Sequence, residues 1–395
     1  MPFAGIHPLP FELLEEIMDY VATSPQEILT LRRVSKTFCS LVTPTAFREI
    51  VIHTTDKSTQ GFLELLASAD VAKHVRVIQI IEDSAVPYSV GIEESGDERY
   101  ERVWNRLKTA CSTLHLIPAL ESLVFTFLPD EESWMKPLTY DNKLSRYQLL
   151  HLHVLEGLAC NPNPLPALRS LQIDDWFAYP DECYAAAPFQ RIVASLRDLR
   201  FLVQDTNYKG ALDRFLAEDF WADVIGPRVL LPAANLETLS MSCNLEFGSL
   251  FRLNLRSITF PCLTSLSLSN FVWDDVRCDP QVVVPEAEDF IVRHGKTLKK
   301  LELHNCAICV PQDRPRPVRS WAAVWNRFAN ELSELVDLVV EFNFSQQYVY
   351  FFPLCGFDSD EAFFLLRGTE QDSPALQGLF TVVEGRKGLT SRDDD

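Results

Sequence analysis

Motifs that would identify an enzyme are missing from this chain of 395 residues. It contains no G-x-S-x-G nucleophile elbow, no G-x-x-x-x-G-K-[ST] or G-x-G-x-x-G phosphate loop and no H-E-x-x-H metal pair. Glycine, on which phosphate loops depend, occurs only 14 times. Adjacent carboxylates such as Asp174-Asp175 point in different directions, which favours turn or cap positions over an acid–base pair. We therefore expect no catalytic residues and no enzymatic activity.

Long apolar runs and an excess of basic residues are also missing. No segment approaches the roughly eighteen uncharged apolar residues that a membrane helix needs. The first thirty residues contain acidic side chains where a signal peptide would be continuously apolar. The net charge of -19 opposes binding to nucleic acid, whose affinity depends on Lys and Arg. We expect a cytoplasmic or nuclear protein with no nucleic-acid or membrane partner.

A paired set of metal ligands is not present either. The ten cysteines are scattered, and the single C-x-x-C consists of Cys306 and Cys309, beside His304. A structural zinc site generally needs a second Cys or His pair. In a reducing compartment such cysteines behave mostly as small buried hydrophobic residues. We expect no metal and no cofactor.

Helix signals are concentrated between residues 7 and 47. Pro10 suits the first turn of a helix, and apolar residues at helical spacing follow it. Ser24 and Glu27 fit a capping box that would begin a second helix. A third apolar run ends at Thr43-Pro44, which is expected to stop its helix. Three or four short helices result, and their apolar surface exceeds what they can bury between themselves.

These residues resemble the F-box, the module that joins a substrate receptor to the Skp-type adaptor of a cullin-RING ubiquitin ligase. The resemblance covers roughly the first fifty residues and rests on Leu9-Pro10-Phe11-Glu12-Leu13-Leu14, Ile17 and Leu29-x-Leu31-Arg32-Arg33-Val34-Ser35-Lys36-x-Phe38. It implies an adaptor-facing set, some of which will be internal core: Leu9, Pro10, Leu13, Leu14, Ile17, Leu29, Leu31, Val34, Ser35 and Phe38. The basic cluster Arg32, Arg33 and Lys36 is either solvated or a rim contact with an acidic adaptor. A simple helical cap on the rest of the protein is the alternative.

The rest of the chain contains irregular copies of the leucine-rich template L-x-x-L-x-L-x-x-N/C. Eight candidate strands follow from these copies, near residues 75–81, 120–126, 168–174, 196–202, 236–242, 263–269, 298–304 and 335–341. Helical faces precede several of them, at 100–114, 286–294 and 318–332. Gly295, which is free to adopt positive φ, suits the end of the second of these helices. This strand–helix alternation requires parallel pairing.

Within the predicted strands, polar residues alternate with leucines. A parallel sheet that is covered on both faces would instead be continuously apolar. One face is therefore expected to be polar and open. If the chain is a substrate receptor, as the resemblance implies, this face is expected to bind a protein target through Gln172, Asp174, Ser240, Ser242, Ser267, Ser269, Glu302 and His304. An ordinary α/β sheet with helices on both faces remains the alternative.

The predicted fold class is α/β: a three-helix F-box at 1–50, then an irregular leucine-rich-repeat solenoid at 51–385 with a curved parallel sheet and outer helices. Residues 82–98 are expected to form a surface loop, and 386–395 a frayed acidic tail. The resemblance implies a substrate receptor of an SCF-type ligase. A leucine-rich scaffold with a helical cap, or a hydrolase that uses Ser and His304 on the strand face, are the other hypotheses.

Overall fold

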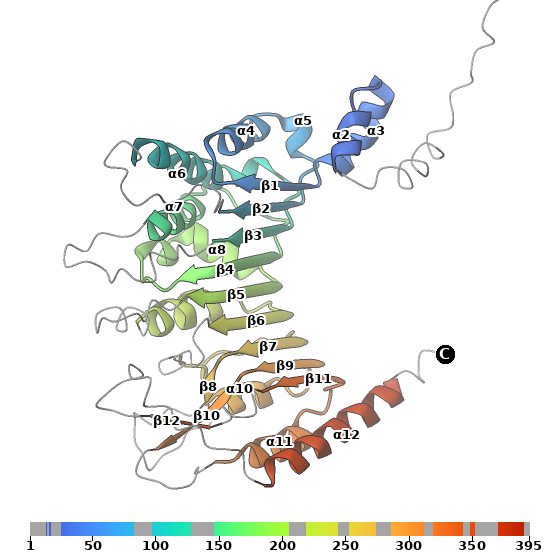
Figure 1. Cartoon of the computed structure of the whole chain (residues 1–395), viewed down its shortest axis with the longest axis vertical. Helices are drawn as coiled ribbons and strands as arrows, with labels where there is room; N and C mark the ends of the chain where they lie inside the picture. Colours follow the sequence, from blue (N-terminus) through green and yellow to red (C-terminus); the bar gives the residue numbers. More distant parts are fainter. Residues whose placement is uncertain are drawn as a thin grey trace, which may run out of the picture.

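A nine-stranded parallel sheet organises the protein, with strands stacked almost in chain order (Figure 1). The computed structural model describes Leu13, Glu16 and residues 25–82, 97–127, 146–204, 219–243, 253–273, 286–311, 319–342, 348–351 and 370–390. The strands are β1 (Glu49–His53), β2 (Val77–Ile81), β3 (Ser122–Thr126), β4 (Ser170–Phe177), β5 (Asp198–Gln204), β6 (Thr238–Cys243), β7 (Ser265–Ser269), β9 (Lys300–His304) and β11 (Asp337–Glu341). Each of the eight predicted segments overlaps one of these strands, although β4, β5 and β6 extend beyond theirs, and β1 is additional.

The two faces of this sheet differ as the alternation requires. Apolar residues of successive strands lie in register, as Ile78, Leu123 and Leu171 do, and these side chains are buried. Full burial of such a leucine stabilises the fold by about 1.5–3 kcal/mol relative to exposure. The residues between them are mostly only partly covered. We call this second side the open face.

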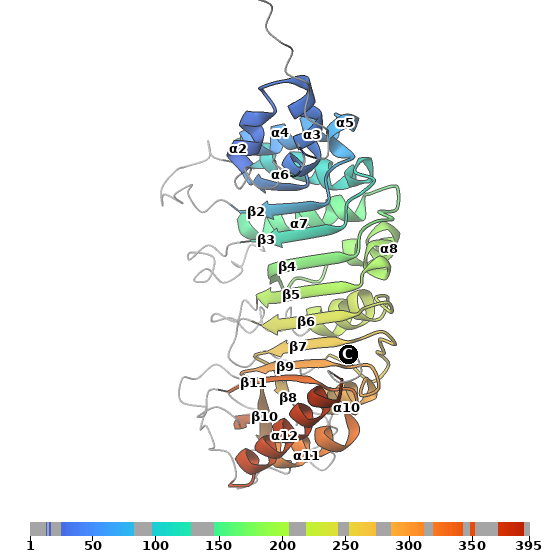
Figure 2. The same ribbon diagram turned by 90° about the vertical axis from the view of Figure 1, so that its right-hand side faces the viewer.

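Helices connect the strands and cover the apolar face (Figures 1 and 2). They are α4 (Asp56–Leu66), α5 (Ala69–Ala72), α6 (Asp97–Ser112), η1 (Leu114–Leu116), α7 (Arg146–Ala159), η2 (Glu182–Ala185), α8 (Ala187–Ser195), the π-helix η3 (Phe220–Leu230), α10 (Glu286–Arg293) and α11 (Trp321–Glu331). The described helices α6, α7, α8, η3 and α10 all lie on one side of the sheet, so the two-sided alternative is wrong for them. Within the described part of the chain, no helix is both long and apolar enough to cross a bilayer.

A second, three-stranded parallel sheet accompanies the last strands of the first. It consists of β8 (Val272–Trp273), β10 (Ala307–Pro311) and β12 (Tyr348–Phe351). Asn270 and Asn305, with φ of 59° and 51°, turn the chain from β7 into β8 and from β9 into β10. Asn adopts this left-handed conformation at lower cost than most residues. The sequence did not predict these strands, because they are short and show no alternation.

A C-terminal helix, α12 (Asp372–Thr390), closes the β11 end of the molecule by packing on α11. Asp372 accepts hydrogen bonds from the backbone N–H of Ala322 at 2.8 Å and from the Tyr348 hydroxyl at 2.7 Å. Arg386 donates to the carbonyl of Leu332 at 2.6 Å, just beyond the other end of α11. Asp372 lies at the N-terminus of α11 and Arg386 at its C-terminus, so both charges interact favourably with the helix dipole.

Three sequence predictions need correction around these elements. The predicted frayed tail begins inside α12, which continues to Thr390 because Arg386 anchors it; residues 391–395 lie outside the described residues. Gly295 does not adopt positive φ, and its role is steric, since a Cβ there would lie 2.4 Å from the Glu331 carbonyl oxygen. Of the predicted loop at 82–98, residues 97 and 98 belong to α6, and 83–96 lie outside the described residues.

Acid sensitivity is expected from His151, which lies on α7 with its ring centroid 3.7 Å from that of Phe127. Burial lowers the pKa of His151 to about 3, whereas the unfolded chain titrates near 6.5. Below pH 6.5 the unfolded state takes up a proton that the folded state excludes, so stability falls as pH falls. The expected loss is about 1 kcal/mol between pH 6.5 and 5.5, measured by urea unfolding. His151→Leu should flatten this dependence by about that amount, and equal slopes for the two proteins would contradict the assignment.

Candidate protein-interaction site

The N-terminal module has a small core of its own. Helices α2 (Pro25–Leu31) and α3 (Lys36–Ala46) bury Ile28, Leu41 and Val42 against each other. This cluster is separate from the large core beneath the sheet. The described part of the module therefore has its own apolar packing, in addition to its connection to β1.

Several of the predicted adaptor-facing residues are exposed. Leu13 is 46% exposed, Leu29 42% and Val34 63%. Leu31 and Phe38 are half-buried and pack against the Ile28 cluster, so they contribute to the module's core. The remaining apolar members of the predicted set lie outside the described residues: Leu9, Pro10, Leu14 and Ile17. Leu13, Leu29 and Val34 are therefore accessible to a partner, which internal packing would not leave them.

Two polar residues of the module have structural roles. Ser35 caps α3, because its hydroxyl accepts a hydrogen bond from the backbone N–H of Phe38 at 3.2 Å. Arg32 donates from Nε to the Thr43 hydroxyl at 3.2 Å, and its guanidinium lies 4.5 Å from the ring centroid of Phe47. Arg32 is therefore held inside the module and is not simply solvated.

The predicted helix stop at Thr43-Pro44 is wrong, since α3 continues through Pro44 to Ala46. Proline lacks one backbone donor, and within the last turn this removes a single hydrogen bond. The Thr43 carbonyl still accepts from the N–H of Phe47 at 3.1 Å. The predicted capping box involves Ser24, which lies outside the described residues.

All the predicted target-binding residues lie on the open face. The middle residues of five consecutive strands form one row in register: Gln172, Arg200, Ser240, Ser267 and Glu302. Asp174, Ser242, Ser269 and His304 lie one alternation further along their strands. Arg200 belongs to this surface although the sequence analysis did not select it. Its alternation with the buried Leu199 and Phe201 was the available signal.

Charged residues on this face pair along the strands and between them. Arg200 bonds Asp198 at 3.1 Å, and Lys300 lies 2.8 Å from Glu302. Burial raises the pKa of Glu302, but the hydrogen bond and charge of Lys300 outweigh it, so this pKa lies below its ordinary value. The exposed pairs contribute little to stability in water. They fix the positions of charges that a partner would meet.

Between the charged strands β5 and β9, the open face carries only small hydroxyl side chains: Thr238, Ser240, Ser242, Ser265, Ser267 and Ser269. Because strands lie about 4.8 Å apart, the backbones of β5 and β9 are separated by about 14 Å across this strip. The side chains of Arg200 and Glu302 border the strip, and the charge of Glu302 contributes to raising the pKa of Arg200, after the larger effect of Asp198.

The same face is more apolar near the N-terminal module. Val51, Val77, Ile81 and Val124 surround Gln79 on strands β1 to β3, and Val51 is 42% exposed. The sequence analysis expected this face to be polar. Aliphatic residues here are a correction to that expectation, and their β-branched side chains are typical of strands.

His304 and Cys306 are residues that the sequence analysis considered for catalytic or metal chemistry. His304 Nδ1 lies 3.0 Å from Glu341 Oε2, an arrangement that would orient an imidazole. However, within the described residues no hydrogen bond joins Ser269 on the adjacent strand to His304. Burial raises the pKa of Cys306 to about 12, and its thiol donates to the Leu268 carbonyl at 3.5 Å. No group of three His, Cys, Asp or Glu side chains in the described residues is placed to hold a metal ion.

Comparison with known families agrees with the N-terminal assignment. Residues 6–48 match the model of the F-box domain. The matched segment includes α2 and α3 and ends immediately before β1. A comparison with curated proteins returns no match. An F-box domain suggests that the chain binds a Skp-type adaptor.

Proposed function

We propose that this protein is the substrate-receptor subunit of an SCF-type E3 ubiquitin ligase in the cytoplasm or nucleus. Its F-box binds a Skp-type adaptor and, through it, a cullin-RING ligase. The open face belongs to a leucine-rich-repeat domain and binds the protein target. The receptor itself supplies no catalytic residue, because ubiquitin transfer takes place on other subunits.

The observation that carries the proposal is the F-box match together with exposed aliphatic side chains in the same segment. Leu29 lies on α2 and Val34 lies in the turn after it. Both side chains are exposed, and they are only a few residues apart in the sequence. Burying such residues in an interface contributes about 25 cal/mol per Å² of apolar surface. A few aliphatic side chains of the F-box would therefore supply most of the free energy of binding to the adaptor.

Target binding is supported by the geometry of the open face. Its hydroxyl strip is bordered by the fixed charges of Arg200 and Glu302, which would orient a partner more than they would tighten its binding. Both surfaces belong to one chain, so the receptor raises the effective concentration of target near the ligase. No new chemistry is needed for this effect.

A single affinity-capture experiment tests both surfaces. The chain is co-expressed with a Skp-type adaptor, and adaptor and other co-purifying proteins are quantified by mass spectrometry. Leu29→Asp with Val34→Asp should lower adaptor recovery about 30-fold or more, because the two buried anchors together contribute about 2 kcal/mol or more. Ser240→Arg with Ser267→Arg should retain the adaptor and lose proteins that are held on the hydroxyl strip.

The matched control is Leu116→Asp with Leu231→Asp, since these leucines are 46% and 52% exposed on the sheet domain. This control should retain the adaptor. If the Leu29/Val34 variant binds the adaptor as well as the control does, the chain is better explained as a leucine-rich scaffold with a helical cap. In that case truncation of the F-box should cause aggregation, because a cap protects an otherwise exposed core.

A further inference from the structure

Backbone groups on the outer edge of β1 have no partner among the residues that the structure describes. Val77 donates to the Arg48 carbonyl at 3.0 Å and Thr54 donates to the Ile81 carbonyl at 3.2 Å, so the even-numbered residues of β1 face β2. In a parallel ladder the intervening residues point their N–H and C=O groups the other way. Glu49, Val51 and His53 therefore face outward, and no described strand pairs with this edge.

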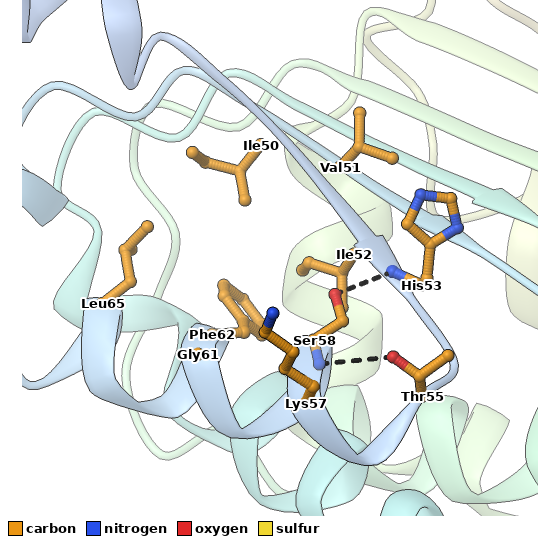
Figure 3. Close-up of a pocket in the computed structure, with 10 residues that line it drawn as sticks. All are labelled: Ile50, Val51, Ile52, His53, Thr55, Lys57, Ser58, Gly61, Phe62 and Leu65. Atoms are coloured by element: carbon orange, nitrogen blue, oxygen red, sulfur yellow. Dashed lines mark hydrogen bonds between the residues drawn. The ribbon is translucent and has the colours of Figure 1, made fainter. Parts of the chain in front are cut away.

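Among the described residues, hydrogen bonds cover only the His53 end of this edge. The His53 N–H donates to the Ser58 hydroxyl at 3.0 Å, and the His53 carbonyl accepts from Thr55 at 2.7 Å (Figure 3). The Val51 N–H and C=O have no partner among the described residues. Proteins usually cover or charge such an edge, because it is a template for another strand.

An apolar groove of about 450 Å³ lies beside the same edge, between β1 and α4. Ile50, Ile52, Phe62 and Leu65 line it, and Figure 3 shows these side chains converging between the strand and the helix. Gly61 forms part of its wall, and a Cβ added there would meet nothing within 4 Å. The groove therefore has room for a side chain from outside.

From these features we infer that β1 binds an extended peptide segment of a partner protein, which adds as a strand to the edge. Free N–H and C=O groups at Val51 require a partner with an extended backbone and not a helix. Alternate side chains of the added strand point to opposite faces, so one aliphatic side chain enters the groove. Lys57 borders the groove and has no ion pair among the described residues, which favours a carboxylate in the peptide. The site lies outside the F-box and differs from the hydroxyl strip.

The test uses the full-length chain and a phage-displayed library of random octapeptides. Enriched peptides are expected to alternate aliphatic residues with others and to contain Asp or Glu. Their affinity is measured by fluorescence anisotropy. Val51→Pro should weaken binding about tenfold or more, since it removes the outward N–H and leaves the pairing with β2 intact. Val51→Thr keeps that N–H and should bind like the wild type.

Gly61→Leu gives a second variant that does not depend on the backbone of β1. Leucine at this position should fill the groove and abolish binding while raising the melting temperature, because it favours helix more than glycine does. The control is Gly378→Leu on α12, where a Cβ also meets nothing within 4 Å; it should leave peptide binding unchanged. Lys57→Glu should weaken the acidic peptides selectively.

Hydrogen exchange at the Val51 amide gives a direct readout. This amide should exchange rapidly in the free chain and become protected when a selected peptide is added. Protection in the free chain would mean that the edge is already covered, and concentration-dependent protection with dimer formation would mean that the occupant is a second copy. Either result, an unenriched library, or full affinity in both Val51→Pro and Gly61→Leu would overturn the inference.

Discussion

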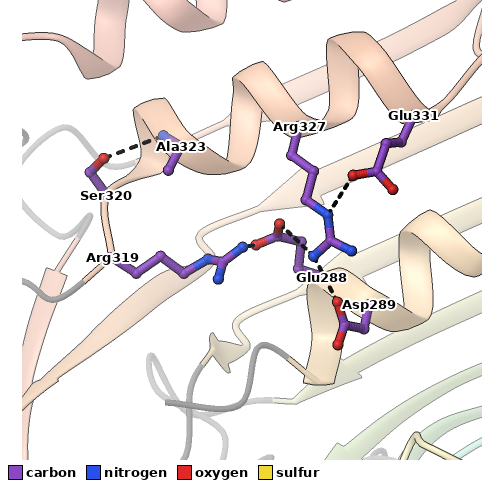
Figure 4. Close-up of polar contacts among 7 residues, drawn as sticks. All are labelled: Glu288, Asp289, Arg319, Ser320, Ala323, Arg327 and Glu331. Carbon is purple, nitrogen blue, oxygen red and sulfur yellow. Dashed lines mark hydrogen bonds and ion pairs between the residues drawn. The ribbon is translucent and has the colours of Figure 1, made fainter. Parts of the chain in front are cut away.

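Changing Glu288 to Gln should lower the free energy of unfolding by about 3 kcal/mol, because it removes the negative charge at the centre of a buried ion network. The Glu288 side chain is only 1% exposed and accepts from Arg319 and from Arg327, the latter at 2.9 Å (Figure 4). Glu288 lies on α10, and it joins this helix to Arg327 of α11 and to Arg319, two residues before α11 begins. The substitution keeps the size of the side chain and leaves two guanidinium groups facing a neutral amide.

Asp289→Asn is the matched control. This neighbouring carboxylate also bonds Arg327, at 2.7 Å, but its side chain is 42% exposed. An exposed pair contributes only about 0–1 kcal/mol, so the control should lower the free energy of unfolding by less than about 1 kcal/mol. Urea unfolding of the full-length variants measures both values. Equal losses for the two substitutions would show that burial of Glu288 does not determine the strength of the network.

The second large effect is expected from Gly157→Ala on α7. A Cβ at Gly157 would lie 2.6 Å from the Lys108 carbonyl oxygen and 2.7 Å from the Cys111 Cβ, both on α6. The two helices would have to move apart, and such overpacking typically lowers stability by about 1–3 kcal/mol. We expect a net loss of about 2 kcal/mol, although alanine is the better helix former.

Gly61→Ala on α4 makes the same chemical change without a steric clash, since nothing lies within 4 Å of the added Cβ. It should raise the free energy of unfolding by about 0.5–1 kcal/mol. Thermal and urea unfolding of both variants measure the two effects. Two changes of the same sign would contradict the close contact between α6 and α7.

The main sheet was largely predictable, because alternation of leucine with polar residues is a direct consequence of strand geometry. The segments Leu239-Ser240-Met241 and Leu266-Ser267-Leu268 contain this signal, and each lies in a strand. Strand β1 was not predicted, since Ile50-Val51-Ile52 has no polar alternation and follows a helix closely. The edge and its groove were missed for the same reason.

The N-terminal module was predictable as a family pattern but not residue by residue. The pattern treats Leu29 and Leu31 alike, although Leu29 is exposed and Leu31 packs inside. Which side of a short helix faces outward depends on its neighbours in space. Ser35 likewise fits the motif as an adaptor-facing residue, yet in the structure its hydroxyl caps the N-terminus of α3. Sequence spacing identifies the members of such a set and not their separate roles.

The order of the main sheet has a consequence for how the protein tolerates change. Each strand pairs with the strand before or after it in that sheet, so the contacts between strands join consecutive units of the chain. Stability in such an array is close to a sum over units and their junctions. A damaged unit therefore weakens mainly its two neighbours. Insertion or loss of a whole unit during evolution would alter the length of the molecule while leaving its two ends, and the surfaces there, intact.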